Sequence, residues 1–439
     1  MNWRLTKFGI KLILLLILIG GLVAGGYWYK QNYWDKNNDP QEEVVYSEIA
    51  QVAFIEEAYQ LIADNYWQAM SEEQLSDIFM QSLSRIYGSQ PELKEKNKAG
   101  LAQRIESLVA NGPETDHSQM LAQVVDIVLQ NLQPFGRSRL YTQQDETALK
   151  NTVSNVDPEA DLLANLGVDE SSTDQEVEEA FEQKIQQIDQ TTATLAQKEE
   201  LIAQTERAYK AVGEQVNRER YAETKVEPTM YGDSLSDSIY YVKIGKFSPT
   251  TVEDLVNILA SMPKNNQGQA LVLDLRNNVG GAIDGLPYFL GPFIGKGQYA
   301  YQFFSQGETE DFKTVTDRVE QINSFKQIVV LIDGGAQSSA EVMAAVLKKY
   351  HVGVLVGFTT KGWGTVERVF PLENQLSEDM THSIFLVHSL TLNEVGEPIE
   401  GEGVTPDIDV TVKGWQQELL GYFNNQELVS EVEILLSQK

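Results

Sequence analysis

A serine and a glutamate at the start of one predicted helix could carry out acyl transfer. Ser338 follows the apolar run QIVVLID through the turn GGAQ and opens the predicted helix SSAEVMAAVLKKYH. A serine at such a junction lies beside the free N–H groups of the helix N-terminus, which can stabilise a developing oxyanion. Glu341 is three residues further and therefore on the same helical face. The spacing S-x-x-E is also that of a capping box, which only satisfies backbone N–H groups, and taken alone it favours that interpretation.

A glycine pair could supply further backbone donors. In LDLRNNVGG, Gly280 and Gly281 follow a predicted buried strand. Glycines let the backbone approach a ligand closely and turn N–H groups toward it. The alternative is an ordinary glycine turn.

A lysine in the stretch TTKGWGTVE is the candidate base. Lys361 stands two residues before Trp363, which lies between two glycines. If the segment is extended, residues 361 and 363 face the same way, about 6.6 Å apart. A lysine acting as a base needs its pKa lowered from about 10.4 to roughly 7–8, and burial against Trp363 would contribute to this. Otherwise Lys361 is a solvated loop charge.

Composition excludes several other chemistries. The 439 residues include 34 basic and 64 acidic side chains, a formal net charge of −30, which argues against binding nucleic acid. There is no cysteine, so thiolate nucleophiles, thiolate ligands and disulfides are excluded. The four histidines form no H-E-x-x-H motif, so no zinc site is indicated. We expect neither a metal nor a cofactor.

The N-terminus has the pattern of a membrane anchor. Leu12 to Tyr29 is uncharged and mostly apolar, close to the roughly 20 residues that span a bilayer. Basic residues precede the run and aromatic ones end it: Arg4, Lys7, Lys11, Tyr27, Trp28, Tyr29 and Trp34. The pattern predicts a cytoplasmic stub and a single-pass signal anchor over 1–35, with the body of the protein outside the cell membrane. A cleaved signal peptide is the alternative.

Two helical regions follow, and then the pattern changes. Apolar residues at helical spacing predict an N-terminal helical domain over 36–156 and a second helical unit over 157–225. Strands and helices then alternate, which indicates an α/β core over 226–412. The tail, 413–439, reads as one or two amphipathic helices. The core elements expected are strands at 239–247, 269–277, 327–333 and 352–358, and helices at 250–263 and 338–351.

Five blocks in this order carry a family resemblance. YYVKIGKFSPTTVEDL, LVLDLRNNVGG, GGAQSSAEVMAAVL, LVGFTTKGWGTVE and GEPIEGEGVTPDIDV closely resemble successive blocks of the C-terminal processing peptidases, or tail-specific proteases. The match runs from about Ile239 to Val412. The preceding helices, with RSRLYTQQDE, look like that family's helical entry domain.

The resemblance implies a serine–lysine dyad. It implies Ser338 as the nucleophile, with the N–H groups of Ser339 and of Gly280 or Gly281 as the oxyanion hole, and Glu341 orienting the base. The family's lysine lies between two glycines, and that position is Trp363 here. Lys361 would then be a displaced base. The alternative is that Trp363 fills the place of a lost lysine.

The second helical unit stands where this family usually has a PDZ domain. Its Leu166-Gly167-Val168 and its closing Arg218 to Tyr221 resemble a J-domain, a partner of chaperones. The His-Pro-Asp tripeptide of J-domains is absent near Asp189-Gln190-Thr191. We expect this J-like unit to be a helical spacer or a docking site for a protein partner.

Together these features predict a membrane-anchored, extracytoplasmic serine peptidase that cleaves polypeptides through an acyl-enzyme at Ser338, with Lys361 as general base. The alternative is an inactive pseudo-peptidase that binds peptides or acts as an adaptor.

Overall fold

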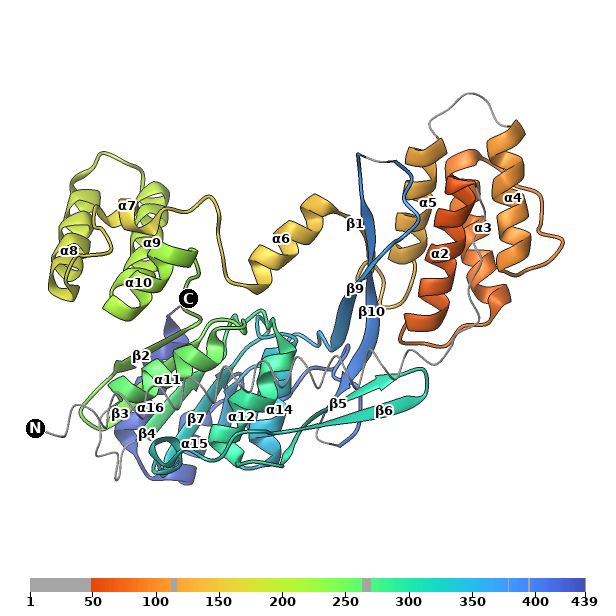
Figure 1. Cartoon of the computed structure of the whole chain (residues 1–439). Helices are drawn as coiled ribbons and strands as arrows, with labels where there is room; N and C mark the ends of the chain where they lie inside the picture. The colour runs from red at the N-terminus through yellow and green to blue at the C-terminus, as the bar shows by residue number, and fades with distance from the viewer. Residues whose placement is uncertain (1–48, 112–116, 263–269, 378, 394, 439) are drawn as a thin grey trace, which may run out of the picture.

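The computed structural model describes residues 49–111, 117–262, 270–377, 379–393 and 395–438 (Figure 1). The expected signal anchor, 1–35, lies outside these residues. Within them, no helix combines the length and the apolar character needed to cross a bilayer.

A six-stranded sheet forms the centre of the C-terminal half. Its strand order is β11-β8-β7-β4-β3-β2, and every neighbouring pair is parallel except the edge pair β2 and β3. The four strands expected from the sequence are confirmed as β3, β4, β7 and β8. The bounds are β2 Met230–Ser234, β3 Ile239–Ile244, β4 Ala270–Asp274, β7 Gln327–Ile332, β8 Val354–Gly357 and β11 Ile408–Asp409.

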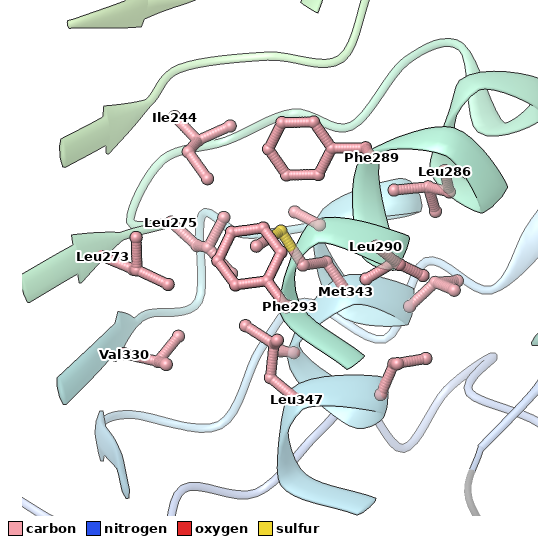
Figure 2. Packing of buried hydrophobic residues seen from close by; sticks show 14 of the residues in the cluster. Ile244, Leu273, Leu275, Leu286, Phe289, Leu290, Phe293, Val330, Met343 and Leu347 are labelled. Carbon is pink, nitrogen blue, oxygen red and sulfur yellow. The ribbon is translucent and has the colours of Figure 1, made fainter. Parts of the chain in front are cut away.

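Helices cover both faces of this sheet, which is why its central strands are apolar on both sides. One face packs against α12 and α14, where Phe289 and Phe293 meet Met343 over Leu273 and Val330 (Figure 2). The opposite face packs against the two helices of the tail, as expected. The helices are α11 Thr251–Ser261, α12 Leu286–Ile294, α13 Glu320–Asn323, α14 Ser339–Lys349, α15 Trp415–Phe423 and α16 Gln426–Ser437, with a 3₁₀ turn at Ile283–Gly285.

A second sheet of five antiparallel strands was not predicted. Its order is β1-β10-β5-β6, with β9 also paired to β10. Strand–helix alternation could not reveal it, because β1 comes from the helical region of the sequence and pairs with a strand some 240 residues away. The bounds are β1 Arg139–Thr142, β5 Tyr299–Ser305, β6 Glu308–Lys313, β9 Thr365–Pro371 and β10 His382–Leu392.

The N-terminal helices dock on this second sheet. Their apolar faces share one buried cluster with Ile384, Leu386 and Val387 of β10. The buried carboxylate of Glu57 also accepts the backbone N–H groups of Glu373 and Asn374, each at 2.7 Å, in the turn between β9 and β10. The helices are α2 Ala50–Asn65, α3 Glu72–Tyr87, α4 Lys98–Asn111 and α5 His117–Gln130, and α6 Gln143–Val153 leads away from them (Figure 1).

The residues of the J-like unit form a separate helical group. Its own small core includes Leu162, Val177 and Tyr221. Arg220 pairs with the buried Asp254 of α11 at 2.7 Å, which fixes the group to the sheet half. The resemblance to a J-domain stays a prediction. The helices are α7 Leu162–Leu166, α8 Asp174–Gln190, α9 Leu195–Val212 and α10 Gln215–Thr224.

Candidate active site

Ser338 lies in the turn between β7 and α14 with a strained backbone. Its φ is +56° and its ψ is −124°, a conformation that residues other than glycine rarely adopt. Such strain costs about 1–3 kcal/mol and is concentrated at functional sites. The N–H of Ser338 donates to Oε2 of Glu341 at 2.9 Å and to the carbonyl of Trp363 at 3.1 Å. The conformation of this residue is thus held from two sides.

Glu341 holds the loop that carries the candidate base. Its fully buried carboxylate accepts the N–H groups of Gly362 and Trp363 at 2.7 and 2.8 Å, besides that of Ser338. The hydroxyl of Thr360 also donates to it, at 2.6 Å. Burial raises the pKa of the Glu341 carboxyl, and these hydrogen bonds oppose that rise. The sequence analysis expected Glu341 to orient the base. Its carboxylate instead accepts hydrogen bonds from the residues on both sides of Lys361 and from Ser338, and has none with the Lys361 amine.

Two backbone N–H groups remain available next to Ser338. Gly280 has φ of +81°, and a Cβ added there would lie 2.7 Å from the Cβ of Ser338, so the loop after β4 lies against the candidate nucleophile. The N–H of Gly280 already donates to Oδ1 of Asn278 at 2.8 Å. In the described ranges, the N–H groups of Gly281 and Ser339 have no protein acceptor. Of the predicted pair of glycines, Gly281 is therefore the available donor.

Lys361 does not have the setting that the sequence argument required. Gly362 adopts φ of +75°, and β9 begins only at Thr365, so residues 361 to 363 are not an extended strand. The Lys361 side chain is exposed, and its amine has no hydrogen bond or ion pair with any residue that the structure describes. The exposed Lys361 side chain therefore lacks the burial against Trp363 that the sequence analysis expected.

Trp363 instead contacts Arg137, from the segment between α5 and β1. The guanidinium carbon of Arg137 lies 3.6 Å from the centre of the Trp363 ring. The same guanidinium donates to Oγ1 of Thr365 at 2.8 Å and pairs with Glu400 at 2.8 Å. Sequence reasoning missed both Arg137 and Glu400, since nothing in the local sequence links residues 263 positions apart.

A second carboxyl group lies beside Trp363. Glu367 of β9 accepts a hydrogen bond from Oγ1 of Thr365 at 2.6 Å. Burial raises the pKa of the Glu367 carboxyl; hydrogen bonds from Thr365 and Trp363 and the charge of Arg137 act in the opposite direction. This residue was also missed. The alternation of Thr365 and Glu367 along β9 was the available signal.

The described residues contain no cluster of three or more histidine, aspartate or glutamate side chains arranged to hold a metal ion. The groups present at Ser338 are a hydroxyl nucleophile and the neighbouring backbone N–H donors. Such a site can form and hydrolyse an ester if a base takes the hydroxyl proton.

Comparison with known proteins agrees with this chemistry. A family model described as Peptidase family S41 matches residues 238–410. The chain is 30% identical over 181 residues to the carboxy-terminal processing protease CtpA of Bacillus subtilis, covering 41% of this chain and 36% of the relative. It is 27% identical over 190 residues to the carboxy-terminal-processing protease of Bartonella bacilliformis, covering 42% of this chain and 41% of that one. The chain thus matches about two fifths of the length of these relatives.

Among solved structures, the photosystem II D1 C-terminal processing protease is 14% identical with a TM-score of 0.46, covering 83% of this chain and 94% of that one. A lipoprotein from Streptococcus agalactiae is 13% identical with a TM-score of 0.41, covering 82% of this chain and 98% of that one.

Proposed function

We propose that this chain is a serine peptidase that cleaves polypeptides through an acyl-enzyme at Ser338, because the model of Peptidase family S41 matches residues 238–410. The observation that carries the proposal is the strained backbone of Ser338 beside the unpaired N–H groups of Gly281 and Ser339. No cofactor or metal takes part in the proposed reaction.

The proposed reaction has two halves. The Ser338 hydroxyl oxygen attacks the carbonyl carbon of a peptide bond, and the carbonyl oxygen becomes an oxyanion that accepts from Gly281 and Ser339. The proton of the hydroxyl passes through the base to the leaving amine, which departs as the C–N bond breaks. Water then attacks the ester carbonyl and gives a proton to the base, and the second oxyanion uses the same two donors. As it collapses, the bond between the acyl carbon and the Ser338 oxygen breaks, the serine takes the proton from the base, and the carboxylic acid product leaves. Removing one such donor in other enzymes costs about 10²–10³ in kcat.

We assign the base to Lys361, in the displaced position that the sequence indicates. Its amine is exposed here, so the assignment requires the flexible side chain to turn toward Ser338 once a substrate excludes water. Catalytic hydrogen bonds are often long in enzymes without substrate and tighten only in the complex. Closure over the site would also provide the desolvation that lowers a lysine pKa.

The alternative is a pseudo-peptidase that binds polypeptides without cleaving them. Two observations favour it: the exposure of Lys361, and the stacking of Trp363 on Arg137, an arginine that cannot release its proton to act as a base. In this case the α7–α10 group would serve as an adaptor for a protein partner.

The sequence also supports a membrane-anchored, extracytoplasmic location, through the apolar segment Leu12 to Tyr29 and the basic residues before it. The helical group in the place of a PDZ domain gives no support for recognition of free carboxyl termini.

Cleavage of an unfolded protein substrate by the wild type, Ser338→Ala, Lys361→Ala and the double variant tests the proposal. We expect both single variants to be inactive and the double variant to be no worse, because members of a dyad act as a unit. Activity that survives Lys361→Ala but not Ser338→Ala would rule out Lys361 as the base and support Ser338 as the nucleophile. A wild type without any activity would favour the pseudo-peptidase.

A further inference from the structure

We propose that Arg137 is a positioning residue, which holds the loop 361–365 against Ser338 and so makes the geometry of the nucleophile depend on the docking of the N-terminal helices. The inference rests on the proposed peptidase function. It concerns a residue outside the family-matched region 238–410.

Arg137 contacts the loop directly at Trp363 and Thr365, and indirectly at Gly364 through Glu400. Its guanidinium stacks on the ring of Trp363 at 3.6 Å and donates to Oγ1 of Thr365 at 2.8 Å. It also pairs with both carboxylate oxygens of Glu400, at 2.8 and 3.2 Å. Glu400 in turn accepts the N–H of Gly364 at 2.9 Å. Stacking and bidentate pairing both depend on the flat guanidinium, which a lysine does not have.

The opposite side of the same loop is held by the helix of the nucleophile. Glu341 of α14 accepts the N–H groups of Gly362 and Trp363, and the carbonyl of Trp363 accepts the N–H of Ser338 at 3.1 Å. The loop is therefore clamped between Glu341 and Arg137. A displacement of Trp363 would be transmitted directly to the backbone of Ser338.

The ion pair between Arg137 and Glu400 is largely shielded from water. The side chains of Arg137 and Glu400 are 15% and 16% exposed. Loss of one partner would leave the other charged and poorly solvated, a situation far more costly than loss of a surface pair. The contacts of Arg137 with Trp363, Thr365 and Glu400 give it the role of positioning the loop, not of transferring a proton.

The backbone on which Arg137 sits is fixed by the docked helices. The next residue, Ser138, is buried and accepts the N–H of Val387 in β10 at 3.1 Å. Two residues on, Arg139 pairs with Asp126 of α5 at 2.9 Å, and the N–H of Leu140 donates to the same carboxylate. Arg137 thus lies at the junction of α5, β10 and the active-site loop, and movement of the helices would move it.

Arg137→Ala and Arg137→Lys test the proposal, with Arg207→Ala as the control. Arg207 of α9 is 44% exposed and pairs with Asp157 at 2.9 Å, but it belongs to the α7–α10 group and does not contact the loop. Three quantities are measured: kcat and KM on a protein substrate, the rate of Ser338 labelling by a fluorophosphonate, and hydrogen exchange of the amides of residues 362–364.

For Arg137→Ala we expect kcat and the labelling rate to fall at least tenfold with KM changed less than threefold, and exchange at 362–364 to rise at least tenfold. Arg137→Lys should recover part of each, and Arg207→Ala should stay within twofold of the wild type. A purely structural role would instead raise exchange across α14 and the sheet as well.

Hydrogen exchange separates this proposal from the proposed function. If the wild type neither cleaves nor reacts with the fluorophosphonate, the peptidase proposal fails, and faster exchange confined to 362–364 in Arg137→Ala still supports the clamp. If Arg137→Ala does not fold, the same exchange measurement on Arg137→Lys decides. Unchanged exchange at 362–364, or unchanged kcat and labelling in an active protein, would overturn the positioning role.

Discussion

At the scale of single residues, the site depends on backbone conformations that side-chain motifs do not encode. The S-x-x-E spacing and the Gly-Gly pair could be read from the sequence, and the structure brings them together around Ser338. The arrangement of Lys361 could not be read, because the positive φ of Gly362 breaks the alternation that the argument assumed. Arg137 and Glu400 could not be found either, since only the fold makes them neighbours.

Gly280→Ala should abolish activity while leaving a folded protein. The added methyl group would lie 2.7 Å from the Cβ of Ser338, at a φ of +81° that costs other residues about 1–2 kcal/mol. We expect at least a hundredfold loss of kcat and a modest decrease in thermal stability. Gly285→Ala is the control, because nothing lies within 4 Å of its added methyl group. Wild-type activity in Gly280→Ala would show that the loop after β4 does not determine the geometry of the site.

Trp363→Lys would place an ammonium group in the position of the family's lysine, next to Arg137 and the carboxyl of Glu367. If Lys361 is the base, we expect activity to stay equal or to fall, because the second amine crowds the first and the Arg137 stack is lost. Trp363→Phe, which keeps an aromatic face for Arg137, should retain most activity. New activity in Trp363→Lys, against an inactive wild type, would contradict the Lys361 assignment and identify a scaffold that has lost only its base.

At the scale of elements, the parallel sheet was predictable and the antiparallel sheet was not. The predictable strands are β3, β4, β7 and β8. They are short apolar runs separated by helices, and this alternation identifies them in the sequence. The second sheet instead joins β1 to β10 and β5, and pairing between strands distant in sequence leaves no local pattern. That sheet is nevertheless the surface that carries the N-terminal helices.

The contact between these helices and β10 should weaken in acid. Burial lowers the pKa of His382, which packs edge-on against Phe54 of α2, and that of His388, whose Nδ1 lies 2.9 Å from the carbonyl of Asn65. The nearby charge of Arg368 lowers the pKa of His388 further, and the Asn65 carbonyl opposes this.

The sign follows from proton linkage. Below the unfolded pKa of about 6.5, the unfolded chain binds protons that the folded protein does not, so stability present above pH 6.5 is lost as the pH falls. We expect the midpoint temperature of thermal unfolding to decrease as the pH is lowered from 7 to 5. The decrease should be smaller in His382→Phe, which keeps an aromatic ring against Phe54. Equal falls in wild type and variant would show that His382 does not contribute.

At the scale of the whole molecule, three helical or α/β parts meet around one loop. The segment after α5 reaches it through Arg137, helix α14 reaches it through Glu341, and the β9–β10 hairpin contains its C-terminal end. The α7–α10 group is fixed elsewhere, through Arg220 and Asp254. This convergence could not be predicted from the sequence, because Arg137 and Thr365 are 228 residues apart and Glu341 and Gly362 are 21 residues apart, so neither contact leaves a local pattern.

The proposed topology places this whole assembly outside the cell membrane. Protease added to intact spheroplasts should digest the chain beyond Asp35, because three basic residues precede the single apolar run. Spheroplasts opened with detergent provide the control for proteolytic susceptibility. A chain that is protected in intact spheroplasts and digested only after opening would contradict the predicted orientation.

The central claim is that Ser338 is a nucleophile. Its most direct test is peptide mass spectrometry after reaction of the whole protein with a fluorophosphonate, in which the serine oxygen forms a bond to phosphorus as fluoride leaves. The account predicts an adduct on Ser338 in the wild type, a rate of formation that falls at least tenfold in Lys361→Ala, and no adduct on the neighbouring Ser339 in Ser338→Ala. A wild type that acquires no adduct on Ser338, under conditions that label a known serine peptidase fully, would contradict it.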